Sequence, residues 1–251
     1  MIVKLGGSLI TYKDKPLSIN LDVLDLVCNA LSKSTIPIIL VHGGGSFGHY
    51  FAEKYKLTRK PSRATAEGVG KTKAAMLELN LKILNCLDKY GISPYFLPPS
   101  DFLEYSFELQ KRLFFFLINY GLTPITYGDI LTKEGGFYVL SGDEIMRMLS
   151  VTLRPSRVIF LLNVDGIFED VNQPDSLIDE LKPEDITKIK LKIPDMDVTG
   201  GMILKLKEAI EIAKSGINVL FINGKDSERI LKALKGELIK GTLIKGIRNE
   251  R

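Results

Sequence analysis

Short apolar runs alternate with longer amphipathic stretches along this chain, which is the pattern of an α/β protein. Each run has the length of a buried strand, and together the runs occupy residues 1–5, 36–41, 92–97, 122–126, 157–163 and 217–223. Between the first two runs, apolar residues recur with helical spacing at Leu21, Leu24, Val27 and Leu31. Strands that alternate with helices pair in parallel. The pattern therefore predicts an α/β fold, with helices flanking a mostly parallel central sheet.

The longest predicted helix, residues 64–90, carries apolar side chains on two faces. One stripe, at seven-residue spacing, consists of Val69, Met76 and Ile83. The other consists of Leu77, Leu81 and Leu84. We expect one stripe to pack on the sheet and the other on a second copy of the chain. Further along, a turn at residues 133–136 precedes an apolar run at 137–140 and predicts a β-hairpin.

Composition narrows the possible functions. The 251 residues are 45% apolar and 25% charged, which is typical of a globular protein with a large core. The net charge of +4 is too small for a nucleic-acid-binding surface. Cys28 and Cys86 lie far apart without a CxxC motif, so neither a zinc site nor a disulfide framework is indicated. Since no signal peptide or membrane span is recognisable, we expect one cytoplasmic domain over residues 1–251.

Three glycine-rich segments follow predicted strands or open predicted helices. They are residues 4–8, 41–49 and 197–205, and the first and third each bring a lysine, Lys4 and Lys205. Backbone N–H groups at a helix N-terminus bind anions, and glycine lets a phosphate approach them closely. The segments together predict a site for a polyanion. For Lys4 alone, an exposed or edge position is the alternative interpretation, because an unpaired ammonium is costly to bury.

Other motifs share parts of this pattern. Gly43, Gly45 and Gly48 satisfy GxGxxG, but the stretch that follows is too polar for the second strand of a dinucleotide fold. An esterase would need a GxSxG motif, and none occurs. Gly70-Lys71-Thr72 resembles the end of a Walker A loop, yet the position five residues before Gly70 is Thr65. These three interpretations are therefore disfavoured.

An ordered set of motifs across nearly the whole chain resembles the amino acid kinase family. The motifs are Lys4-Leu-Gly-Gly-Ser8, Val41-His-Gly-Gly-Gly45, Pro124-Ile-Thr-Tyr-Gly-Asp129, Leu140-Ser-Gly-Asp143, Asn163-Val-Asp-Gly166, Thr199-Gly-Gly-Met-Ile-Leu-Lys205 and Gly241-Thr-Leu-Ile244. The resemblance implies a three-layer αβα sandwich that forms a homodimer. It also implies an N-terminal lobe, about 1–155, for the phosphate acceptor and for dimerisation, and a C-terminal lobe, about 156–251, for ATP.

The resemblance also assigns roles to individual residues. Those implied to bind ATP are Lys4, Gly6, Gly7, Ser8, Gly45, Asp165, Gly201 and Lys205. Those implied to act in catalysis are Lys4, Lys13, Asp143 and Lys205, with Lys15 as the alternative to Lys13. Asp143 would orient the lysines, although a helix N-cap explains its position equally well. Asp165 would contact the nucleotide, although an Asx turn is the alternative. Mg²⁺ would be held mostly by ATP oxygens and water, without a cluster of protein ligands.

Within the family, Gly45-Ser-Phe-Gly-His49 and Leu140-Ser-Gly-Asp143 are most similar to kinases that phosphorylate isopentenyl phosphate. The acceptor phosphate would then meet Gly44, His49 and Gly142, and its apolar tail would border Val69, Met76 and Ile83. A phosphate monoester is already largely dianionic at neutral pH, so His49 is expected to donate a hydrogen bond rather than abstract a proton. The alternatives are another acceptor, such as a nucleoside monophosphate or a phosphonate, or a nucleotide-binding module without turnover.

Overall fold

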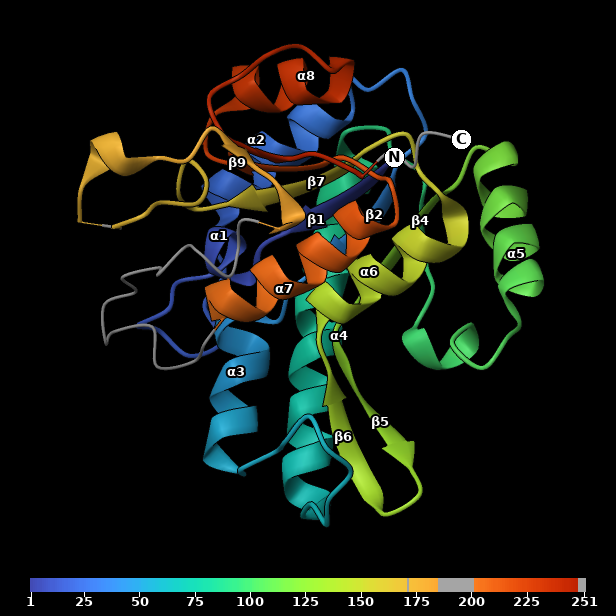
Figure 1. Ribbon diagram of the computed structural model, residues 1–251. Helices are drawn as coiled ribbons and strands as arrows, with labels where there is room; N and C mark the ends of the chain where they lie inside the picture. Colours follow the sequence, from blue (N-terminus) through green and yellow to red (C-terminus); the bar gives the residue numbers. More distant parts are fainter. Residues whose placement is uncertain (171, 185–200, 248–251) are drawn as a thin grey trace.

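The computed structural model describes residues 1–170, 172–184 and 201–247, and an eight-stranded sheet forms its centre (Figure 1). The strands cross the sheet in the order β3 (Pro94–Phe96), β4 (Thr123–Tyr127), β2 (Ile39–His42), β1 (Ile2–Leu5), β7 (Val158–Leu162), β9 (Val219–Asn223), β10 (Thr242–Ile244) and β8 (Glu180–Leu181). Within these residues, every neighbouring pair is parallel except β9 and β10. Each of the six predicted apolar runs contributes a strand, so the mostly parallel sheet is confirmed.

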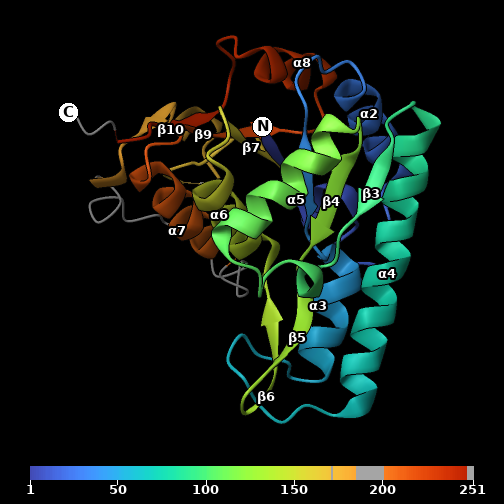
Figure 2. The same cartoon turned by 90° about the vertical axis from the view of Figure 1, so that its right-hand side faces the viewer.

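Helices cover both faces of this sheet (Figure 1, Figure 2). One face carries α5 (Phe107–Asn119), α6 (Gly142–Leu153) and α7 (Gly201–Lys214). The other carries α2 (Leu21–Leu31), α4 (Ala66–Lys89) and α8 (Ser227–Lys235). The short helix α1 (Gly7–Ile10) and helix α3 (Gly45–Lys54) follow β1 and β2 directly, and 3₁₀ turns lie at Pro99–Asp101 and Pro174–Ser176. The predicted three-layer αβα sandwich is confirmed.

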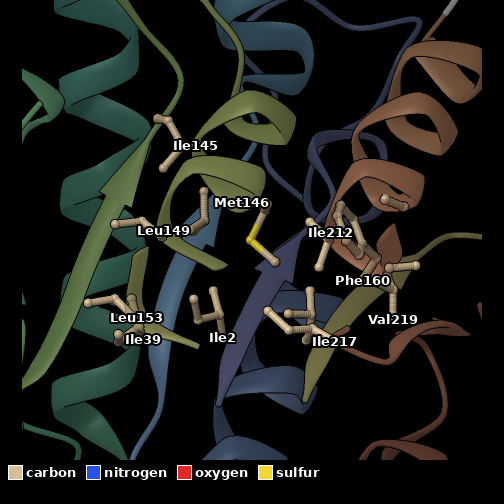
Figure 3. Close-up of a cluster of buried hydrophobic side chains, with 14 of the residues drawn as sticks. Ile2, Ile39, Ile145, Met146, Leu149, Leu153, Phe160, Ile212, Ile217 and Val219 are labelled. Atoms are coloured by element: carbon tan, nitrogen blue, oxygen red, sulfur yellow. The ribbon is translucent and has the colours of Figure 1, made fainter. Parts of the chain in front are cut away.

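The pleat of the central strands divides the core into two clusters. Ile2 packs with Phe160 and with side chains of α6 and α7 (Figure 3), whereas Val3 and Leu5 pack with α2 and α4 on the opposite face. Because side chains alternate along a strand, Lys4 lies on the same side as Ile2. Its Nζ is 5.8 Å from the centre of the Phe160 ring. Lys4 is only 3% exposed, so the edge position considered for it from sequence is wrong.

The long helix α4 and a β-hairpin extend together from one end of the sheet. The hairpin consists of β5 (Asp129–Lys133) and β6 (Gly136–Leu140), as predicted. Lys73 of α4 donates from Nζ to Asp129 Oδ2 at 2.6 Å and to the Ile130 carbonyl oxygen at 3.1 Å. Figure 2 shows α3 and the first half of α4 beside the hairpin. The Lys73 contacts therefore tie the hairpin to the helix.

The two apolar stripes of α4 differ in burial. Met76 and Ile83 are buried, whereas Leu77 and Leu81 of the other stripe are 49% and 57% exposed. The first stripe therefore faces the protein and the second faces outward. On α2, the predicted inward face is correct except for Leu21, which is 62% exposed. Leu21 is the first residue of the helix and precedes the positions that pack.

No helix in residues 1–170, 172–184 or 201–247 has the length and apolar character that crossing a membrane requires. The longest of them, α4, alternates its apolar stripes with charged residues, including an ion pair between Lys82 and Glu78. Its length therefore serves packing along the sheet and against the hairpin.

Candidate functional site

Two glycine loops lie in direct backbone contact at the ends of β1 and β2. A Cβ atom at Gly7 would lie 2.3 Å from the Gly45 nitrogen, and one at Gly43 would lie 2.8 Å from the Gly7 nitrogen. Gly45 also has φ of +49°, which L-residues rarely adopt. Side chains are thus excluded at this contact. Since α1 and α3 both begin here, their first-turn N–H groups lie close together, as an anion site requires.

Thr11 joins the two loops through its hydroxyl group. Its Oγ1 donates to the Gly7 carbonyl oxygen at 2.8 Å and accepts from the Ser46 backbone nitrogen at 2.9 Å. The segment that follows is fixed to the same place, because the Ser18 backbone nitrogen donates to Ser46 Oγ at 3.3 Å. In the sequence, Thr11-Tyr-Lys13 is only part of the family resemblance, and this bridging contact of Thr11 was not predicted because it depends on the approach of two loops far apart in the chain.

The two candidate lysines of this segment, Lys13 and Lys15, are both exposed. Lys15 Nζ lies 5.6 Å from the centre of the Tyr12 ring, within the range of a cation–π contact. Among the described residues, the Lys13 side chain has no hydrogen bond or ion pair. Lys13 is therefore the lysine of this segment whose charge is uncommitted.

Lys4, Asp143 and Lys205 form a charge cluster in which Lys4 and Asp143 are buried and Lys205 is partly buried. Asp143 accepts a short hydrogen bond from Lys4 Nζ, and Lys205 Nζ lies 3.1 and 3.2 Å from the two carboxylate oxygens of Asp143. Burial lowers the pKa of Lys4 to about 7. The Asp143 charge raises this pKa, whereas the Lys205 charge lowers it further. Burial would raise the pKa of Asp143, but the Lys4 and Lys205 charges outweigh it and hold that pKa well below its usual range.

The N-terminus of α6 brings Asp143 to this cluster. Ser141 is the N-cap, since its Oγ accepts from the Glu144 backbone nitrogen at 3.2 Å and the Glu144 carboxylate accepts from the Ser141 nitrogen at 3.1 Å. The N-cap role considered for Asp143 is therefore wrong. A Cβ at Gly142 would lie 3.4 Å from Lys4 Nζ and 3.0 Å from the His42 carbonyl oxygen, so Gly142 lets α6 approach β1 and β2.

The two histidines have different environments. His42 is fully buried, with Nδ1 3.2 Å from the Gly43 carbonyl oxygen and Nε2 3.3 Å from Asn80 Oδ1. Burial lowers the pKa of His42 to about 4, so it is neutral at pH 7 and has a structural role. His49 lies one turn into α3 and is exposed. Its pKa is also lowered, because the surrounding protein removes part of the solvent around the ring and because the charges of Lys205 and Lys4 are nearby.

The first apolar stripe of α4 approaches the second glycine loop at one residue. The Met76 sulfur lies 3.0 Å from the position of a Cβ on either Gly44 or Gly48. Val69, two turns earlier, is half-buried. Ile83, two turns later, is fully buried in the core cluster with α2. The structure thus brings Met76 to the loop and places Ile83 in the core.

Asp165 lies in a second charged cluster beyond β7 and β9. Its Oδ1 accepts from Arg229 Nη1 at 2.7 Å and Asn223 Nδ2 at 3.1 Å, and its Oδ2 pairs with Lys240 Nζ at 2.7 Å. These donors, Lys240 first, hold the pKa of Asp165 well below its usual range. Sequence reasoning missed Arg229, Asn223 and Lys240, which no local motif connects to Asp165.

The remaining predicted residues lie around the Lys4 cluster. Gly6 approaches the Leu161 carbonyl oxygen, from which a Cβ would be 2.7 Å, and Ser8 is half-buried in α1. Gly201 starts α7, which carries Lys205, while residues 197–200 of the same motif lie outside the described residues. Within the described part of the chain, no group of three His, Cys, Asp or Glu side chains could hold a metal ion.

Proteins of known family and structure are similar to this chain over nearly its full length. The profile of the amino acid kinase family matches residues 1–223. Isopentenyl phosphate kinase from Methanothermobacter thermautotrophicus is 31% identical over 98% of this chain and 99% of its own length. The enzyme of that name from Methanocaldococcus jannaschii is 32% identical over 97% of both chains. A crystal structure of the T. acidophilum isopentenyl phosphate kinase product complex has a TM-score of 0.79 at 27% identity, covering 98% of this chain and 99% of that one. The chain belongs to the amino acid kinase family.

Proposed function

We propose that this chain transfers the γ-phosphoryl group of ATP to isopentenyl phosphate, giving isopentenyl diphosphate and ADP. The observation that carries the proposal is the Lys4–Asp143–Lys205 cluster beside two glycine loops in contact. The full-length similarity to isopentenyl phosphate kinases supports the choice of acceptor. A cytoplasmic location stays a prediction from the sequence.

Transfer between two anions is limited by their repulsion and by alignment, so the chain has to supply positive charge and fixed geometry. Asp143 holds Lys4 and Lys205 together, and its single negative charge leaves one positive charge in excess when Lys4 is protonated. We assign these two lysines to the phosphates of ATP. Lys13, which lies on the segment fixed to the glycine loops, is assigned to the charge of the transferring group.

The N-terminal N–H groups of the glycine loops would hold the phosphates in line. Gly6, Gly7, Ser8, Gly45 and Gly201 all lie at or next to helix starts in this region. An anion there meets the positive end of each helix. Mg²⁺ bound to ATP would neutralise phosphate charge, and ATP oxygens and water would supply most of its ligands.

The two halves of the chain would serve the two substrates. Apart from Lys4 and the glycine loops, which would meet the phosphates of ATP, we assign residues 1–155 to the acceptor, because α3 with His49 and α4 with Met76 come from this half. We assign residues 156–251 to ATP. Here Asp165 is engaged by Arg229 and Lys240, so it would orient these cations toward the nucleotide rather than bind it alone.

The acceptor itself would lie between Gly44, Gly142 and His49. Its phosphate is already dianionic at neutral pH, so a hydrogen-bond donor is more useful than a base. The lowered pKa keeps His49 neutral, and a neutral imidazole still has one N–H to donate. We assign Met76 and Val69 to the apolar tail, whereas Ile83 serves the core.

We also propose that the chain forms a homodimer at the β3 edge of the sheet. Figure 2 shows α4, β3 and α5 along this side. Large apolar side chains of these elements are exposed. Leu81 is 57%, Tyr95 41%, Phe116 64% and Tyr120 76% exposed. An exposed apolar surface of this kind is typical of an interface.

The acceptor is tested with wild-type enzyme, ATP, Mg²⁺ and a panel of isopentenyl phosphate, geranyl phosphate, a nucleoside monophosphate and a phosphonate. We expect ADP release to be fastest with isopentenyl phosphate. A higher kcat/KM for a nucleoside monophosphate or phosphonate would reject isopentenyl phosphate as the acceptor.

Met76→Ala or Val69→Ala should raise kcat/KM for geranyl phosphate relative to isopentenyl phosphate. The smaller side chain makes room for the longer tail, and each methylene that the tail buries contributes about 0.8 kcal/mol. If this ratio of kcat/KM values is unchanged in both variants, the apolar tail of the acceptor does not border Met76 or Val69.

Lys4→Ala and Lys205→Ala should each lower kcat by about a hundredfold or more, because each removes a charge directed at the phosphates. Lys207→Ala is the matched control, since Lys207 lies on the same helix and is exposed. Circular dichroism would verify folding of all three variants. Near wild-type turnover in a lysine variant would remove that lysine from the mechanism.

His49→Ala should raise the KM for isopentenyl phosphate and leave the KM for ATP nearly unchanged, because its proposed partner is the acceptor phosphate. His49→Gln should retain more activity, since the amide is still a donor. Steady-state kinetics with each substrate varied in turn distinguishes these effects. A selective loss of ATP affinity would contradict the assignment.

Analytical ultracentrifugation of the wild type should give the mass of a dimer of two 28.0-kDa chains. Leu81→Lys should shift this toward the monomer, because it places a charge in the proposed interface. Leu238→Lys is the control, since Leu238 is 99% exposed and lies outside α4, β3 and α5. A wild-type monomer, or dissociation by the control alone, would refute this interface.

A further inference from the structure

Arg59 is a cation near the site to which none of the sequence motifs points. It lies on the segment between α3 and α4, and the β5–β6 hairpin fixes this segment by backbone hydrogen bonds. Val139 donates from its nitrogen to the Thr58 carbonyl oxygen at 2.8 Å. Ser62 and Phe137 exchange two further bonds, both of 3.0 Å. Arg59 is therefore held on the hairpin side of the site by contacts on both sides of it.

The guanidinium of Arg59 reaches the N-terminus of α6. Its Nη1 lies 3.8 Å from Glu144 Oε2, which is beyond hydrogen-bond distance. The same oxygen already accepts from the backbone nitrogen and the hydroxyl of Ser141, both at 3.1 Å. Glu144 is thus committed to capping the helix and holds Arg59 only loosely. The Arg59 side chain is 42% exposed, so it is free to exchange this partner for another.

Arg59 is also electrostatically close to the reaction centre. Its charge is among the causes that lower the pKa of Lys4 and of His49, after burial and the nearer lysines. Glu144, which it approaches, directly follows Asp143 of the buried cluster. Arg59 therefore lies beside the hairpin and the N-terminus of α6, close enough for its charge to act on both His49 and Lys4.

We propose that Arg59 leaves Glu144 and binds the phosphate of the acceptor, so that it selects acceptors that carry a phosphate monoester. A planar guanidinium can donate two parallel hydrogen bonds to phosphate oxygens, and such charged pairs are about twice as strong as neutral ones. The ion pair that it gives up is long and partly exposed, and pairs of that kind contribute little. The exchange therefore favours the bound acceptor. This inference rests on the proposed function.

The test compares wild type, Arg59→Ala, Arg59→Lys and Arg63→Ala with each substrate varied at saturating levels of the other. Arg63 is the matched control because it is exposed and lies on the same segment. We expect Arg59→Ala to raise the KM for isopentenyl phosphate by about tenfold or more, the loss typical of a charge-assisted hydrogen bond. The KM for ATP should stay within about twofold. Arg59→Lys should lie between wild type and Ala, because it keeps the charge and loses the two-pronged geometry.

A second measurement titrates isopentenyl phosphate into nucleotide-free enzyme by calorimetry, where binding by Arg59→Ala should be weakened in parallel with the KM. Equal behaviour of Arg59→Ala and Arg63→Ala in both experiments would overturn the role of Arg59. A rise confined to the KM for ATP would overturn it as well. Wild-type turnover in the same assay tests the proposed function separately, so failure of the two ideas is distinguishable.

Discussion

A positively charged side chain lies in the middle of the central sheet, and the arrangement of one layer of helices depends on it. Lys4 belongs to β1, between β2 and β7, and is almost fully buried. An ammonium in this position is tolerated only with a charged partner, and removal of that partner costs about 3–5 kcal/mol. Asp143 of α6 is the partner, and it also binds Lys205 of α7. One carboxylate thus fixes a strand and two helices relative to one another.

The same cluster explains why the site suits a polyanion. Two lysines share one carboxylate, so the cluster carries a net positive charge whenever Lys4 is protonated, and its surroundings screen that charge poorly. Gly7 and Gly45 place the starts of two helices directly beside each other. The negative charge of a bound phosphate would neutralise the positive charge of this cluster. In the proposed function, burial of Lys4 would therefore serve phosphate binding as well as the fold.

The side of the site that we propose for the acceptor is built differently from the cluster. Its parts are α3, the first half of α4 and the β5–β6 hairpin, which extend beyond the sheet and hold one another. Lys73 ties the hairpin to α4 through Asp129, and backbone bonds tie it to the segment of Arg59. The side chains of Lys73 and Arg59 are 44% and 42% exposed, in contrast to the buried Lys4 and Asp143 of the cluster.

The sequence by itself predicted six strands of the central sheet, the helices α2 and α4, the hairpin and the glycine loops, because each depends on local periodicity or on the backbone freedom of glycine. It did not predict the strands β8 and β10 or the helices α5 and α8. It also indicated Lys4, Asp143 and Lys205 through motifs that resemble a known family. The tertiary structure alone decided that Lys4 is central rather than at an edge, and that Ser141 rather than Asp143 caps α6. It also decided that Ile83 belongs to the core and that Arg229 and Lys240 engage Asp165. These outcomes depend on the order of strands and on contacts between segments far apart in the chain, which local patterns do not encode.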